Sequence, residues 1–128
     1  MGVEINPLDK NSSEFNILKE YCVRTWPENK HASKKIRNIF KIQRKGEGEA
    51  YEQFDDLANK FLLFHGSRIS NFMGIMSQGL RVAPPEAPKT GYMFGKGVYF
   101  ADMFQKSIKY CNDFNSSSVS RAPTNNGI

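Results

Sequence analysis

The spacing of apolar residues predicts a helix in the first quarter of the chain. Apolar side chains recur there at intervals of three or four positions, which is typical of one face of an amphipathic helix over residues 13–25. The members of this face are Phe15, Leu18, Tyr21 and Cys22. Polar residues 11–14 offer N-cap side chains at a spacing close to that of a capping box. Pro27 ends the helix because proline lacks an N–H donor.

The next stretch alternates between helix and strand patterns. Residues 36–44 place alternate side chains on opposite faces, and β-branched isoleucines flank that alternation, so we expect a strand. Apolar positions at helical spacing predict a second helix over roughly residues 48–59. The continuous apolar run Phe61-Leu62-Leu63-Phe64 is typical of a short buried strand, and His65-Gly66 ends it.

The second half is punctuated by capping residues, glycines and prolines. Ser70 is placed to cap a helix through about Gln78, with Gly79 at the C-terminal position that favours a left-handed residue. Three prolines within residues 83–88 exclude both helix and interior strand, since each removes a donor and fixes φ. We therefore expect a stiff surface loop there.

The last predicted elements follow a glycine-rich segment. Residues 98–101 predict a second short strand, and Asp102 is expected to cap a final helix that ends at about Cys111. Residues 112–128 are rich in Asn and Ser and lack hydrophobic periodicity, so they predict loop. With no internal repeat or linker, residues 1–128 form one domain or part of one.

Composition narrows the class of protein. The 128 residues are 39% hydrophobic and 24% charged, as in a soluble globular chain, and no stretch approaches 18 apolar residues. We therefore expect no membrane span, and the polar start predicts no secretory signal. Cys22 and Cys111 fit neither a disulfide framework nor a metal-binding spacing, so we expect a reducing compartment and no metal.

Charge is spread unevenly. The net charge is +5; residues 1–60 hold 11 basic and 10 acidic side chains, whereas residues 61–128 hold 7 basic and 3 acidic ones. A half with so few carboxylates suits an anionic ligand such as a dinucleotide. The basic run over 30–45 has two interpretations, nucleic-acid contact or a solvated loop and strand face. Flanking glutamates and the lack of an interleaved aromatic platform favour the second.

The densest candidate chemistry lies between positions 61 and 111. His65-Gly66-Ser67 closes a predicted strand, where Gly66 admits a ligand to the backbone and Ser67 adds a hydroxyl, a set that suits a planar amide. Tyr99 and Tyr110 are spaced to sandwich a flat ring. Taken singly, the histidine is more often structural, the tyrosines are more often core, and the Gly-Lys-Gly at 95–97 is usually a turn and no P-loop.

Together these motifs resemble a known family. HGSR at 65–68, GLRVAPPEAP at 79–88, TGYMFGKGVYFADM at 90–103 and KSxxYC at 106–111 stand in the order and spacing of the poly(ADP-ribose) polymerase catalytic domain. That domain belongs to the diphtheria-toxin-like ADP-ribosyltransferases, and the motifs take the form found in nuclear, DNA-damage-responsive members. The resemblance covers about residues 4–111. It implies an α+β fold with two packed, mainly antiparallel sheets and flanking helices, with the C-terminal strands missing.

The resemblance also implies a site for NAD, the ADP-ribose donor. His65 and Tyr99 match catalytic positions; His65 would bind a ribose hydroxyl, and Tyr99 would stack on the nicotinamide ring with Tyr110. Arg81 would flank the adenosine side, and the loop 79–92 would cover the donor. The full set of implied NAD-binding residues is His65, Gly66, Ser67, Arg81, Gly97, Tyr99, Phe100, Ala101, Lys106, Ser107 and Tyr110.

One member of the family's His-Tyr-Glu triad has no counterpart. No glutamate follows Glu86, and neither Asp102 nor Asp113 fits the position. We expect this polypeptide alone to have negligible transferase activity, and a catalytically incomplete NAD-binding or interaction fragment is the alternative function. The resemblance implies protein acceptors and poly(ADP-ribose) as partners, DNA contact only through domains outside this chain, no membrane, and a nuclear location. A basic nucleic-acid-binding module is a third interpretation.

Overall fold

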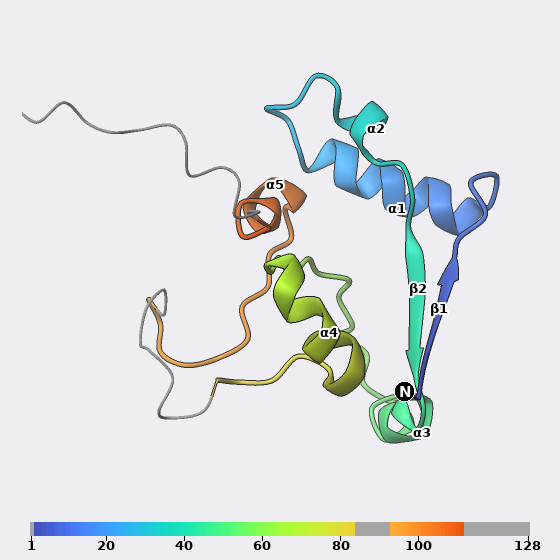
Figure 1. Ribbon diagram of the computed structural model, residues 1–128, viewed down its shortest axis with the longest axis vertical. Helices are drawn as coiled ribbons and strands as arrows, with labels where there is room; N and C mark the ends of the chain where they lie inside the picture. The colour runs from blue at the N-terminus through green and yellow to red at the C-terminus, as the bar shows by residue number, and fades with distance from the viewer. Residues whose placement is uncertain (1, 84–92, 112–128) are drawn as a thin grey trace, which may run out of the picture.

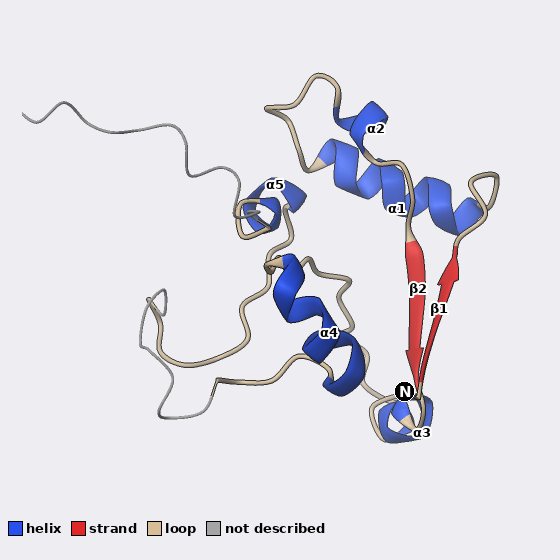
Figure 2. Cartoon of the chain, in the orientation of Figure 1, coloured by secondary structure: helices blue, strands red, loops and turns tan. Residues whose placement is uncertain are grey.

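The computed structural model describes residues 2–83 and 93–111, which form an α+β arrangement as predicted (Figure 1). Figure 2 shows the two strands as one pair, with helices and loops beside them. In chain order the elements are β1 (Val3–Pro7), α1 (Ser13–Arg24), α2 (Ala32–Lys35), β2 (Phe40–Arg44), α3 (Glu47–Glu52), α4 (Ile69–Gln78) and α5 (Phe104–Ile108).

Strands β1 and β2 form a two-stranded antiparallel sheet. Their register runs from Val3 opposite Arg44 to Pro7 opposite Phe40. The strand predicted over 36–44 is therefore confirmed in its second half, whereas β1 was not predicted from the residue pattern. Pro7 is tolerated in β1, although it offers no N–H to a ladder, because β1 is an edge strand of the two-stranded sheet.

Helix α1 begins and ends close to where the sequence predicts. The Ser12 hydroxyl caps it by accepting the Phe15 N–H at 3.1 Å, so the cap is Ser12 and the expected capping box from residue 11 does not form. Thr25 follows its last residue, two positions before Pro27. Phe15 is 3% exposed and anchors the apolar face of the helix.

Two stretches differ from the predicted helices. The short helix α2 lies inside the basic run, where only loop and strand were expected. Helix α3 ends at Glu52 instead of continuing to residue 59, because the following backbone closes tighter i to i+3 bonds, such as Phe54 N–H to Tyr51 O at 2.8 Å. Residues 84–88 of the proline-rich loop expected at 83–88, and the loop expected at 112–128, lie outside the described residues.

The two short strands expected at 61–64 and 98–101 reduce to one antiparallel bridge between Phe64 and Ala101. Within the described residues no strand pairs with Phe61 or Leu62, which are 79% and 64% exposed. An apolar strand without neighbours cannot form a ladder, so the wider pairing is not made. The prediction of a buried strand over 61–64 is therefore wrong, since Phe61, Leu62 and Leu63 are exposed.

The caps of the last two helices also differ from prediction. Arg68, and not Ser70, is the N-cap of α4, and Met103, and not Asp102, is the N-cap of α5; neither makes a side-chain cap bond. Gly79 does end α4 with φ of 81°, and its N–H donates to Ile75 O at 2.8 Å. No helix in the described ranges is long and apolar enough to cross a membrane.

Candidate functional site

The Phe64–Ala101 bridge brings two distant segments together. The Phe64 N–H donates to Ala101 O at 2.7 Å, and the Ala101 N–H donates to Phe64 O at 2.9 Å. This pair of bonds fixes the residues that follow Phe64 against those that precede Ala101. His65 and Tyr99 thereby meet although 34 positions separate them.

His65 is held in one tautomer by the neighbouring backbone. Its Nδ1 atom lies 2.8 Å from the carbonyl oxygen of Tyr99. A carbonyl oxygen only accepts, so Nδ1 carries the proton in this bond. In the neutral ring, Nε2 is then an acceptor, which is the state that receives a hydrogen bond from a sugar hydroxyl. The imidazole also lies against Phe100, with ring centroids 5.8 Å apart.

Gly66 sits directly against the backbone of α5. A Cβ at position 66 would lie 1.8 Å from the Ser107 carbonyl oxygen and 2.7 Å from its carbonyl carbon. Real Cβ contacts are never this short, so any other residue would push the strand end and α5 apart. Ser107 itself is buried, with 6% exposure. We call His65, Gly66, Tyr99 and Ser107 the strand-end cluster.

The phenol of Tyr99 is held by the glycine-rich turn before it. The Phe94 N–H donates to the Tyr99 hydroxyl at 3.2 Å, and that hydroxyl donates to the Gly95 carbonyl. Gly95 has φ of 91°, a conformation that favours glycine. The Tyr99 side chain is nevertheless 40% exposed. Its hydroxyl is thus fixed while part of its ring remains open to a ligand.

A second feature is an open groove of about 400 Å³ along α4. We call it the α4 groove; it is lined by Ser70, Asn71, Gly74, Ile75, Gln78, Gly79 and Arg81. The Arg81 guanidinium donates to Gln78 Oε1 at 2.7 Å, which holds its positive charge at the end of the helix. At the other end, the Asn71 amide donates to Ser67 Oγ at 3.0 Å. Ser67 therefore joins the strand end to the groove.

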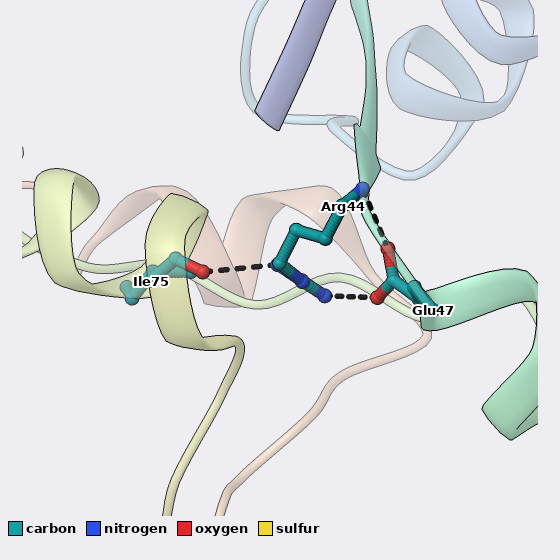
Figure 3. Close-up of polar contacts among 3 residues, drawn as sticks. All are labelled: Arg44, Glu47 and Ile75. Atoms are coloured by element: carbon teal, nitrogen blue, oxygen red, sulfur yellow. Dashed lines mark hydrogen bonds and ion pairs between the residues drawn. The ribbon is translucent and has the colours of Figure 1, made fainter. Parts of the chain in front are cut away.

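Arg44 of β2 fastens the C-terminal end of α4 (Figure 3). Its Nη1 donates to the Ile75 carbonyl at 3.0 Å, and its Nη2 pairs with the Glu47 carboxylate at the start of α3. A Cβ at Gly79 would stand 3.5 Å from the same guanidinium. Arg44 thus lies behind the α4 groove and connects it to the sheet.

Comparison with known proteins shows the family to which the chain belongs. The sequence model described as "Poly(ADP-ribose) polymerase catalytic domain" matches residues 12–120. The chain belongs to the poly(ADP-ribose) polymerase catalytic domain family. The resemblance inferred from the motifs at 65–111 is therefore confirmed, and it extends over most of the chain.

Individual polymerases are similar to the chain over most of its length. It is 56% identical over 105 residues to a poly [ADP-ribose] polymerase of Drosophila melanogaster and 54% identical over 113 residues to poly [ADP-ribose] polymerase 1 of Gallus gallus. It is 52% identical over 109 residues to poly [ADP-ribose] polymerase 2 of Zea mays. These matches cover 81%, 88% and 84% of the chain but 11%, 11% and 17% of the relatives. The chain therefore spans under a fifth of their length.

The structure distributes the residues predicted to bind NAD over two places. His65, Gly66, Tyr99 and Ser107 meet in the strand-end cluster, flanked by Phe100 and Ala101. Arg81 stands apart from them, in the α4 groove. Of the remaining positions, Ser67 accepts a hydrogen bond from the Asn71 amide of α4. Gly97 precedes Tyr99 in the glycine-rich segment, and Lys106 and Tyr110 are exposed on and after α5. The NAD-binding roles of all these residues stay predictions.

Three residues that support the strand-end cluster and the α4 groove were not predicted from sequence. The hydroxyls of Tyr21 and Thr25 contact the strand end and α5, and Arg44 fastens the α4 groove. Arg44 was counted only as part of a basic run, and Tyr21 only as an apolar helix position. In the described ranges no group of three or more His, Cys, Asp or Glu could hold a metal ion.

Proposed function

We propose that this chain carries the NAD-binding part of an NAD-dependent ADP-ribosyltransferase. The observation that supports this most is the strand-end cluster, where the His65 tautomer is set by Tyr99 O and only glycine fits at position 66. The nicotinamide amide binds at the Gly66 backbone and Ser107, and its ring stacks on Tyr99 and Tyr110. The adenosine side follows the α4 groove, with Arg81 beside the diphosphate and ribose.

The reaction breaks the bond between the nicotinamide nitrogen and the ribose carbon. The bonding electron pair leaves with nicotinamide, and a nucleophile of the acceptor protein attacks that carbon and gives up a proton. Charge develops on the ribose as in glycoside cleavage, through an oxocarbenium-like transition state. His65 orients the ribose through Nε2, and Tyr99 holds the leaving ring in place. Extension into poly(ADP-ribose), nuclear residence and DNA repair belong to this proposal.

A carboxylate that faces the developing charge is missing from the described site. The sequence holds no glutamate after Glu86. Removing one preorganised electrostatic group typically costs about 10²- to 10³-fold in rate. We therefore propose that this 128-residue polypeptide binds NAD but turns it over negligibly, which is the behaviour of a catalytically incomplete fragment. Automodification from labelled NAD at a rate near that of a complete polymerase domain would contradict it.

The test of the binding proposal is an NMR titration of the chain with NAD. We expect NAD to shift the amide signals of His65, Gly66 and Ser107, and His65→Ala to weaken binding about tenfold, the value of a hydrogen bond in a preorganised site. His31→Ala is the matched control, because His31 is exposed and makes no side-chain cap bond at α2. Equal NAD affinity of the two variants would overturn the assignment of His65.

A further inference from the structure

The hydroxyl of Tyr21 lies between the two segments that carry the strand-end cluster. It is 3.1 Å from the Leu62 carbonyl oxygen and 3.0 Å from the Asp102 carbonyl oxygen, and it shares its proton between them. Leu62 precedes Phe64, and Asp102 follows Ala101, so the two acceptors lie on either side of the bridge. One side chain of α1 therefore ties both strand ends at the point where they pair.

The ring of Tyr21 packs on the same bridge. Its centroid is 4.5 Å from that of Phe64, which in turn lies 5.4 Å from that of Phe104 at the start of α5. Trp26, just beyond α1, completes this aromatic row at 5.2 Å from Phe104. The ring contacts stabilise the packing of α1 against the bridge, and the hydroxyl adds directional hydrogen bonds to the two carbonyls. Replacing the tyrosine by phenylalanine separates the two contributions.

Thr25 performs the corresponding task for α5. Its Oγ1 accepts the Phe104 N–H at 3.1 Å, and its carbonyl accepts the Gln105 N–H at 3.1 Å. The first N–H groups of a helix have no partner within the helix, and Met103 offers α5 no side-chain cap. Thr25 Oγ1 itself donates to Tyr21 O at 2.8 Å. Thr25 is thus a cap supplied from 79 positions away.

These contacts converge on one part of the site. α5 carries Ser107, whose carbonyl lies against Gly66, and the bridge carries His65 and Tyr99. In Figure 1, α5 lies beside α1, whose C-terminal end provides both hydroxyls. We propose that Tyr21 and Thr25 are positioning residues that set the nicotinamide half of the site and leave the α4 groove unaffected. This rests on the proposed function.

The first test uses Tyr21→Phe in the 128-residue chain with two probes, nicotinamide and AMP, titrated separately. We expect nicotinamide affinity to fall about 5- to 10-fold, since a directional bond to two carbonyls is lost while the ring stays. AMP affinity should stay within about twofold, because Tyr21 is not among the described residues that line the α4 groove. Tyr51→Phe is the control, since Tyr51 is 51% exposed on α3 and lies outside both halves.

The second test uses Thr25→Val and Thr25→Ser. Valine keeps the shape but leaves the Phe104 N–H without its acceptor, so we expect the same selective loss of nicotinamide affinity, about 5- to 10-fold. Serine restores the hydroxyl and should recover most of it. Equal losses for both probes, failure of serine to rescue, or nicotinamide affinity unchanged in both Tyr21→Phe and Thr25→Val would each overturn the positioning role.

A readout without ligand separates this inference from the proposed function. The His65 Nδ1 proton, bonded to Tyr99 O, should give a slowly exchanging NMR signal in the parent chain and in Tyr51→Phe, and a broadened one in Tyr21→Phe. If the parent chain binds neither nicotinamide nor NAD, the proposed function fails while this signal still decides the positioning role. An unchanged signal in Tyr21→Phe would then contradict it.

Discussion

The strand-end cluster and the α4 groove are held in place by different chemistry. In the cluster, Gly66 meets the backbone of Ser107 with no room for a side chain, and His65 bonds to the Tyr99 carbonyl. At the groove, Arg44 reaches from β2 to the Ile75 carbonyl and the Glu47 carboxylate. The first region depends on close backbone fit, and the second on a charged side chain.

This difference predicts how each region responds to change. Close-packed backbone tolerates no added atom and is insensitive to salt, because its contacts are short and uncharged. A partly exposed ion pair contributes modestly and weakens as ions screen it; the Arg44 and Glu47 side chains are 26% and 43% exposed. A ligand that spans both regions should therefore lose most affinity from steric change in the cluster and least from screening at the groove.

Gly66→Ala should have the largest effect. The added methyl would stand 1.8 Å from Ser107 O, so α5 must move away from the strand end. Overpacking of this kind costs about 1–3 kcal/mol, which corresponds to about 5- to 150-fold in nicotinamide affinity. Calorimetric titration with nicotinamide and with AMP measures it, and AMP should change much less.

The matched control for this variant is Gly48→Ala. A Cβ at Gly48 meets nothing within 4 Å, its φ is not positive, and it lies within α3. Alanine there should raise the free energy of unfolding by about 0.5–1 kcal/mol, since glycine is a poorer helix former. Parent-like nicotinamide affinity in Gly66→Ala would show that the contact with Ser107 does not shape the site.

Arg44→Met should act on the other region. It keeps a long apolar side chain but loses the Glu47 pair and the bond to Ile75 O, so the end of α4 is released from the sheet. We expect AMP affinity to fall about three- to fivefold, as for a partly exposed ion pair, with nicotinamide affinity unchanged. Lys41→Met, which removes the exposed Lys41–Glu14 pair on the same strand, should leave both affinities unaltered. A loss of nicotinamide affinity in Arg44→Met would remove the distinction between the two regions.

Salt should distinguish the regions without any substitution. Raising the salt from about 0.1 M to about 1 M shortens the screening length from about 10 Å to about 3 Å. We expect AMP, an anion near Arg81, to bind about two- to threefold more weakly, while the neutral nicotinamide is unaffected. Parallel titrations at both salt concentrations measure this. Equal salt dependence for the two probes would place the same charges in both halves.

The sequence predicted the local elements of these regions better than their supports. Periodicity placed α1 to within a residue, because an amphipathic face is a local property. Gly79 marked the end of α4 correctly, whereas its N-cap lies two residues before the predicted Ser70. The sequence motifs also indicated His65, Tyr99 and Ser107, since each motif is contiguous in the chain. Tyr21 was counted only as an apolar position, yet its hydroxyl reaches 41 and 81 positions along the chain.

The incorrectly predicted N-caps also show that local sequence cannot reveal contacts between distant residues. Asp102 has the side chain of a good N-cap, but α5 starts after Met103 and receives its cap from Thr25, 79 positions away. Capping rules consider only neighbours in sequence, whereas an orphan N–H accepts any oxygen that the fold brings near. β1 was missed for a related reason: five residues predict a strand poorly until β2 pairs with them.

The smallest effect concerns Cys22 on α1, next to Tyr21. Burial raises the pKa of the Cys22 thiol above its ordinary value of 9.0, and a backbone hydrogen bond offsets part of this rise. The folded state therefore holds the thiol proton more tightly than the unfolded state does. The stabilisation is fully present below pH 9.0 and is lost as the pH rises through the folded-state pKa.

Between about pH 7 and pH 10, the urea midpoint of the parent should fall slightly more than that of Cys22→Ala. Cys111→Ala, which removes the exposed thiol after α5, is the matched control variant. If Cys22→Ala and the parent lose stability equally, the end of α1 is not desolvated where it supports the strand-end cluster.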